Sequence, residues 1–143
     1  MKSLLLLTAI IFTFHLNAAN FNKKEVENLT SVIKHNVKAM NDEDINAYMQ
    51  DVHPNSPGYA ATKNMLTQLF KIYDLKVTLI SIKPLMIDDQ YFIVRAQQKT
   101  IKKSGTAPFS DNIIDVIHVY KKYQNKWLLW SSMILEVKKL NKK

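Results

Sequence analysis

The chain has 143 residues, enough for one domain with its own hydrophobic core. Its apolar fraction of 47% and charged fraction of 22% are those of a globular protein and exclude a disordered one. The absence of cysteine excludes disulfides, a thiol nucleophile and a thiolate metal site. The net charge is +8, but Arg95 is the only arginine, so the scattered lysines predict a solvated surface and no nucleic-acid partner.

Residues 1–19 are predicted to form a secretory signal peptide. Lys2 precedes a short apolar run, and the small residues Ala18 and Ala19 follow it. The run is too short to cross a hydrocarbon core of roughly 30 Å. An uncleaved N-terminal anchor is the alternative interpretation. We expect an exported protein, periplasmic or secreted, with a single domain over residues 20–143 and no integral membrane segment after signal cleavage.

Three helices are expected in the first half of this domain. Asn22 and Glu25 have the spacing of a capping box, and apolar residues then follow at helical intervals as far as Met40. The acidic segment 41–44 ends this helix and caps a second, shorter one. A turn with two prolines at 53–58 separates it from a third helix over about 60–73, expected to bury its apolar residues.

The second half is predicted to consist of strands. One covers 76–83, and another covers 87–102 with a turn at 88–90. A long hairpin over 112–137 closes the chain, and its polar break at 122–126 suits a short loop. This order predicts an α+β fold with the helices packed on one face of an antiparallel sheet.

Neither face of the hairpin is polar. On the first strand one face carries Asp115, Ile117 and their alternate neighbours, and the opposite face carries Val116 and His118. A sheet that is apolar on both sides needs cover on both sides. We therefore expect helices on one face and, on the other, a second subunit in a homodimer, or else a sheet that wraps around a cavity.

Several segments resemble nuclear transport factor 2-like domains. Residues 39–49 are similar to the family's turn and short second helix, and Asp51 falls where the family often has an acidic residue. Residues 126–132 resemble its last strand, and 53–57 resembles a segment of small bacterial members. The resemblance covers about residues 23–137, essentially the whole domain.

The resemblance implies a cystatin-like α+β cone, in which a strongly curved sheet wraps around a long helix, encloses an apolar pocket and commonly dimerises. Relatives include ketosteroid isomerases, SnoaL-like cyclases, dehydratases and non-catalytic modules, so the fold leaves the function open. We expect a domain that binds a small apolar ligand or a partner protein. A lyase or isomerase with general acid–base chemistry is the alternative, and a module whose pocket is plugged by its own side chains is the third.

A proton-abstracting enzyme of this kind needs a base and an oxyanion donor in the pocket. Asp51 and His118 are the candidate catalytic residues, with Tyr48, Tyr73 or His118 as donors. The structural alternative is that Asp51 caps a loop and the tyrosines fill the core. His118 is either a pocket group or a hydrogen-bonded core histidine. Asp115 lies three positions before His118 on a strand and faces the opposite side.

The candidate ligand-binding residues are Tyr48, His53, Tyr73, Arg95 and Trp130. An arginine in an apolar strand is costly unless it is paired. Arg95 is therefore expected either to meet a ligand carboxylate or to pair with Asp115 or Asp111.

Two further histidines are expected at the surface. His53 lies in the proline turn, at the mouth of the cone, so His53→Ala is expected to leave stability almost unchanged. His35, between Lys34 and Lys38 in sequence, is expected to be solvated. No histidine or carboxylate pair has a metal-site spacing, and glycine-rich phosphate loops are missing, so we expect neither a metal nor a cofactor.

Overall fold

The computed structural model describes residues 21–140, so the predicted signal peptide lies outside the described residues. The predicted order of helices and strands is confirmed. The elements are α1 (Lys23–Asn41), α2 (Ile45–Gln50), α3 (Tyr59–Ile72), β1 (Tyr73–Ile87), β2 (Tyr91–Gly105), β3 (Asn112–Tyr123) and β4 (Lys126–Lys139). Within residues 21–140, no helix combines the length and the apolar character needed to cross a bilayer.

Side-chain caps set the starts of the first two helices. Asn22 accepts a hydrogen bond from the backbone N–H of Lys24 at 2.9 Å, and Asp44 accepts one from that of Ala47 at the same distance. The predicted role of Glu25 in a capping box is replaced by another contact. Its carboxylate accepts a hydrogen bond from the indole Nε1–H of Trp127 at 2.6 Å, which ties the first turn of α1 to β4.

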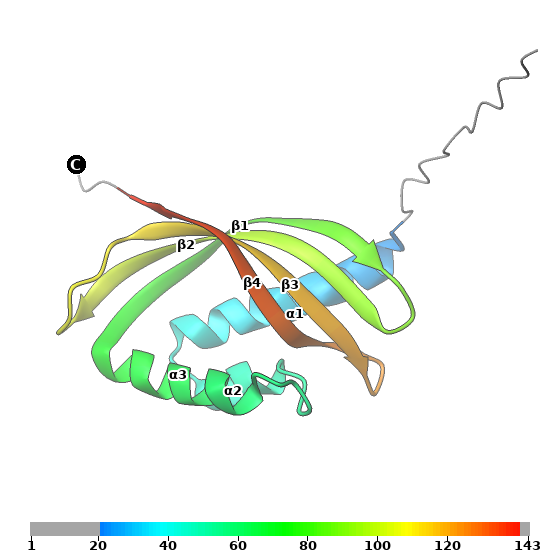
Figure 1. Cartoon of the computed structure of the whole chain (residues 1–143), viewed down its shortest axis with the longest axis horizontal. Helices are drawn as coiled ribbons and strands as arrows, with labels where there is room; N and C mark the ends of the chain where they lie inside the picture. Colours follow the sequence, from blue (N-terminus) through cyan, green and yellow to red (C-terminus); the bar gives the residue numbers. More distant parts are fainter. Residues whose placement is uncertain (1–20, 141–143) are drawn as a thin grey trace, which may run out of the picture.

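The four strands form one curved antiparallel sheet in the order β1-β2-β3-β4 (Figure 1). All three helices lie on the concave side of this sheet. β1 extends past the predicted end at Lys83 and includes Pro84, where its pairing with β2 shifts register. An edge strand tolerates proline because one row of its backbone groups has no neighbouring strand to bond.

The two tight turns follow from local chemistry. Asp88 accepts hydrogen bonds from the backbone N–H groups of Gln90 and Tyr91, which confirms the predicted turn at 88–90. The turn separates β1 from β2, so the strand predicted over 87–102 begins only at Tyr91. Gln124 and Asn125 connect β3 to β4 with φ values of 46° and 63°. Positive φ at both positions is typical of the hairpin loop that fits the twist of two paired strands.

The core is divided into two clusters. One packs α1 against the sheet through Leu29, Ile33, Phe92 and Trp127. The other joins α2 and α3 through Met49, Val52 and Leu66. Leu129 of β4 packs against both clusters. The remaining space between the helices and the sheet is left open, and the candidate site lies there.

Candidate functional site

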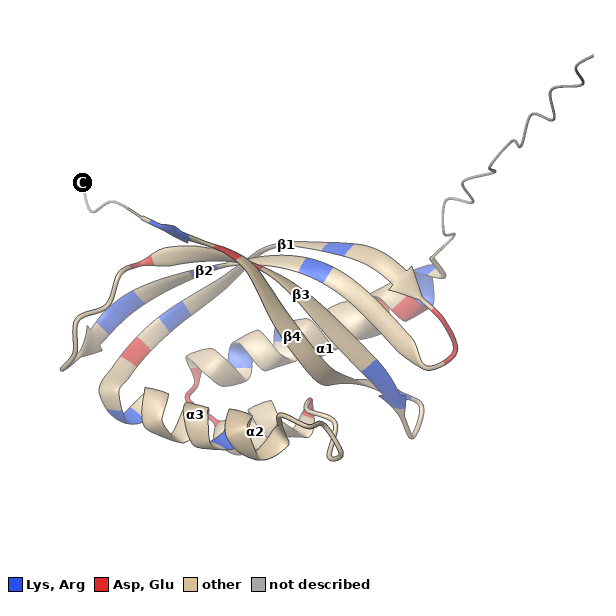
Figure 2. Cartoon of the chain, viewed as in Figure 1, with Lys and Arg blue, Asp and Glu red and all other residues tan. Residues whose placement is uncertain are grey.

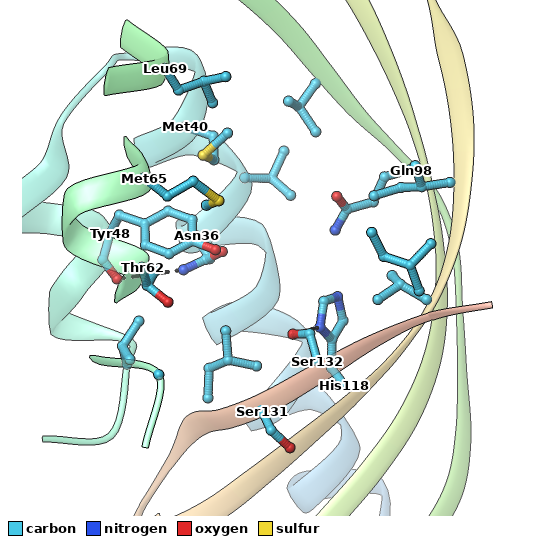
Figure 3. Close-up of a pocket in the computed structure, with 18 of the residues that line it drawn as sticks. Asn36, Met40, Tyr48, Thr62, Met65, Leu69, Gln98, His118, Ser131 and Ser132 are labelled. Atoms are coloured by element: carbon cyan, nitrogen blue, oxygen red, sulfur yellow. Dashed lines mark hydrogen bonds between the residues drawn. The ribbon is translucent and has the colours of Figure 1, made fainter. Parts of the chain in front are cut away.

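A cavity of about 740 Å³ lies between the helices and the concave face of the sheet (Figure 3). This volume is within the usual range for small-molecule sites. Met40, Leu69, Val77, Ile114 and Val116 are among the apolar residues that form most of its wall. The helices contribute one side of the wall and all four strands contribute the other.

The cavity is open to solvent. Met65 of α3 and Ile134 of β4 both line it, yet they are 55% and 59% exposed. The expected burial of Met65 is therefore wrong, because the space beside it is cavity and not packed core. These two exposed apolar residues place the entrance between α3 and the C-terminal half of β4.

Polar side chains from both sides interrupt the apolar wall. Gln98 of β2, His118 of β3 and Ser132 of β4 line the sheet side, and Asn36 and Tyr48 line the helix side (Figure 3). His118 and Ser132 are register partners, and Nδ1 of His118 lies 2.8 Å from the hydroxyl oxygen of Ser132. Because Ser132 occupies Nδ1, a ligand in the cavity would meet Nε2.

The wall is electrically neutral. Burial lowers the pKa of His118 from 6.5 to about 4, so its imidazole is uncharged at neutral pH. Burial also raises the pKa of Tyr48, which keeps its phenol protonated. Within residues 21–140, no aspartate, glutamate, lysine or arginine lines the cavity, and no group of three metal-ligating side chains occurs.

Asp51 lies outside the cavity wall, so the two predicted catalytic residues do not converge. It is the C-cap of α2, and its carboxylate oxygen Oδ2 lies 2.6 Å from Nδ1 of His35 on α1. Burial raises the pKa of Asp51, and the hydrogen bond from His35 opposes that increase. His35 is exposed, as expected, with 47% of its side chain accessible, but the sequence did not predict its bond to Asp51.

Arg95 lies on the convex face of the sheet, away from the cavity. Its Nε donates to Oδ1 of Asp115 at 2.7 Å and its Nη2 to Oδ2 at 2.6 Å. This confirms the structural pairing, and the predicted ligand contact is not supported. The hydrogen bonds from Arg95 lower the pKa of Asp115, which holds this buried side chain in its charged form.

Trp130 lines the cavity, and His53 lies behind it. The two ring centroids are 4.9 Å apart in an edge-on arrangement. His53 is 4% exposed, which makes the expectation of an exposed loop residue wrong. The turn folds over β4 because the backbone N–H of His53 donates to Leu129 O and the Ser56 hydroxyl donates to Trp130 O.

Tyr73 supports the cavity wall without lining it. Its hydroxyl donates to the carbonyl oxygen of Pro108 at 3.0 Å, and its ring packs edge-on against Phe109, which does line the cavity. Gly105 allows this loop to start close to α3. It has a φ of 131°, and a side chain there would collide with the Ile72 carbonyl oxygen.

Sequence reasoning missed Gln98, Ser132 and Asn36 as cavity residues. Gln98 had a detectable signal, because it continues the alternation of the buried residues Val94 and Ala96 on one face of β2. A polar side chain at an apolar position of this kind indicates a cavity or a buried hydrogen bond. Asn36 and Ser132 had no comparable local signal.

Among curated proteins, no sequence matches this chain significantly. Solved structures do match this chain. A protein of unknown function with a cystatin-like fold from Nostoc punctiforme has a TM-score of 0.64 at 8% identity, covering 79% of this chain and 91% of that one. An NTF2-like protein from Shewanella oneidensis has a TM-score of 0.58 at 16% identity, covering 76% and 97%. A candidate dehydratase of the NTF2-like family from Streptomyces avermitilis has a TM-score of 0.64 at 13% identity, covering 79% and 97%.

These structures show that the chain has the NTF2-like, cystatin-like fold, which confirms the resemblance. At such low identity they show the fold alone. One protein-family model, that of the C-terminal domain of anti-sigma-I factor RsgI9, matches residues 31–140. Because this match spans most of the chain, the protein belongs to the family of RsgI9 C-terminal domains.

Proposed function

We propose that this domain binds a small, largely apolar molecule in the cavity between its helices and its sheet. The observation that carries the proposal is the open cavity of about 740 Å³ with a mostly apolar wall. Apolar side chains gain stability when they pack together, so an unfilled apolar space is better explained by a ligand than by folding. The family name describes part of a regulatory factor, which is consistent with binding rather than catalysis.

The proposal is tested with N-phenylnaphthylamine, an uncharged dye whose fluorescence increases in apolar sites. The wild-type protein is expected to bind it with saturation at a single site. Ile114→Trp places a large ring in the cavity and is expected to weaken binding by about tenfold or more.

Ile113→Trp is the matched control, because the adjacent residue points to the opposite face of the same strand. This variant is expected to bind the dye as the wild type does, and circular dichroism checks that both variants fold. Equal dye binding by the wild type and Ile114→Trp would refute binding in the cavity, as would a wild type that binds no dye.

A lyase or isomerase remains the second candidate function. It is favoured by the neutral imidazole of His118 and the protonated phenol of Tyr48, which line the same cavity and could act as base and donor. A fold shared with a candidate dehydratase agrees with this role. If the domain is such an enzyme, the wild type would chemically convert a molecule that binds in the cavity, and His118→Phe would leave that molecule unchanged.

Export and dimerisation belong to the same proposal. The sequence of residues 1–19 supports export, and N-terminal sequencing of the protein recovered from its host would detect signal cleavage. The exposed apolar side chain of Met133, which pairs with Ile117 on the convex face, supports a homodimer that forms through the outer face of the sheet.

A further inference from the structure

This protein is strongly basic, yet the cavity wall formed by its described residues carries no charged side chain. Figure 2 shows lysine and arginine distributed over helices and strands, and the net charge is +8. Nevertheless, no aspartate, glutamate, lysine or arginine of residues 21–140 lines the cavity. A site for a carboxylate or phosphate would be expected to direct at least one of these many cations inward.

The polar groups that do line the cavity are neutral hydrogen-bonding groups. Gln98 offers an amide, Ser132 a hydroxyl, and His118 an uncharged imidazole whose Nδ1 is already bonded to Ser132. Burial lowers the pKa of His118, so a ligand cation or anion would meet no compensating charge there. Transfer of an unpaired charge into such a wall is strongly unfavourable.

From this arrangement we infer that the ligand is an uncharged molecule, with an apolar body and a hydroxyl or carbonyl group that meets the His118–Ser132 pair and Gln98. This inference rests on the proposed binding function and specifies its ligand class. The apolar body would contact Met40, Met65 and Leu69 on the helix side, opposite the polar groups of the sheet (Figure 3).

The test of charge compares two dyes with the same aromatic skeleton, N-phenylnaphthylamine and its anionic analogue anilinonaphthalene sulfonate. At physiological salt the wild type is expected to bind the uncharged dye at least about tenfold more tightly than the sulfonate. The sulfonate provides a stringent comparison, because the protein's net charge of +8 would otherwise favour it.

Gln98→Lys introduces one cation into the wall and is expected to reverse this preference. The matched control is Gln97→Lys, which adds the same charge one residue away, on the convex face that carries Asp115. This control should keep the wild-type preference. Circular dichroism checks that both variants fold, and if Gln98→Lys does not fold, Thr100→Lys replaces it on the same wall.

The test of the polar contact uses naphthol and naphthalene as competitors of the uncharged dye. Naphthol is expected to bind about three- to tenfold more tightly, the usual effect of one hydrogen bond, and His118→Phe should remove the difference. Two results would overturn the inference and leave the binding function intact. One is that the wild-type cavity binds the sulfonate as tightly as the uncharged dye. The other is that naphthol and naphthalene compete equally well. Binding of neither dye would overturn the proposed function itself.

Discussion

The carboxylate of Asp51 and the imidazole of His35 are joined by a 2.6 Å hydrogen bond that links the end of α2 to the middle of α1. The backbone of Asp51 also accepts a hydrogen bond from the N–H of Leu129 on β4 at 2.7 Å. Asp51 therefore connects two helices and the sheet at one point. Because Asp51 is 9% exposed, His35 is an important partner for its buried charge.

His35→Ala is expected to destabilise the protein by about 1–3 kcal/mol at neutral pH, since it leaves a buried carboxylate without this partner. Burial already raises the folded-state pKa of Asp51, and the loss of His35 would raise it further. A raised carboxyl pKa stabilises the fold at acid pH, and this contribution is lost as the pH rises through the folded-state pKa. The cost of the substitution is therefore expected to be smaller near about pH 4 than at neutral pH.

Urea denaturation at the two pH values measures this difference. Lys34→Ala, at the exposed neighbouring position of α1, is the control and is expected to change stability by less than about 0.5 kcal/mol. A His35→Ala cost that is independent of pH would show that Asp51 does not depend on this bond.

His53→Ala is expected to lower the free energy of unfolding by more than about 2 kcal/mol, contrary to the expectation from the sequence. The imidazole is buried between Trp130 and Tyr123, and its Nδ1 accepts a hydrogen bond from the backbone N–H of Asn55. Asn55→Ala alters an exposed side chain of the same turn and serves as the control. Equal stability of His53→Ala and the wild type would mean that the turn does not pack on β4 in solution.

The fold was predictable where signals are local. Asn22 and Asp44 cap helices because their short side chains bond backbone N–H groups within three residues. Strand alternation likewise placed His118 on the same face as Val116, and the structure shows that this face is the concave one.

Contacts between distant residues were not predictable in this way. His35 and Asp51 are 16 residues apart, and the lysines around His35 suggested a solvated face. His53 belongs to a turn whose proline composition is typical of exposed loops, but its neighbour in space is Trp130, on the last strand. The burial of His53 depends on how the segment after α2 packs on β4, and no local sequence pattern predicts that packing.

His118 is expected to make the protein less stable as the pH falls. Burial lowers its folded-state pKa from 6.5 to about 4, so the folded protein binds this proton less readily than the unfolded chain. Its contribution is complete above about pH 6.5 and is lost as the pH falls towards about 4. His118→Phe should therefore lose less stability across this interval, as measured by thermal unfolding. Parallel pH profiles for the two proteins would contradict a neutral imidazole in the folded state.

Arg95→Met is expected to reduce the melting temperature and to leave binding of the uncharged dye within about twofold of the wild type. It removes the partner that holds the buried Asp115 in its charged form, on the face opposite the cavity. The double variant Arg95→Met/Asp115→Leu is expected to recover part of the lost stability, because no unpaired charge remains. A large loss of dye affinity in Arg95→Met would instead place Arg95 in the ligand site.

Met133→Lys is expected to convert the proposed homodimer into a monomer. Met133 is 57% exposed and is the register partner of Ile117, on the convex face of the sheet. A lysine at this position would have to bury its charge in a sheet-to-sheet interface, which is unfavourable without a partner. Light scattering at micromolar concentration gives the mass, and Gln68→Lys on α3 adds the same charge to an exposed position on the helical side. A wild-type mass of one chain would refute the dimer, whereas a dimer that survives in Met133→Lys would place the interface elsewhere.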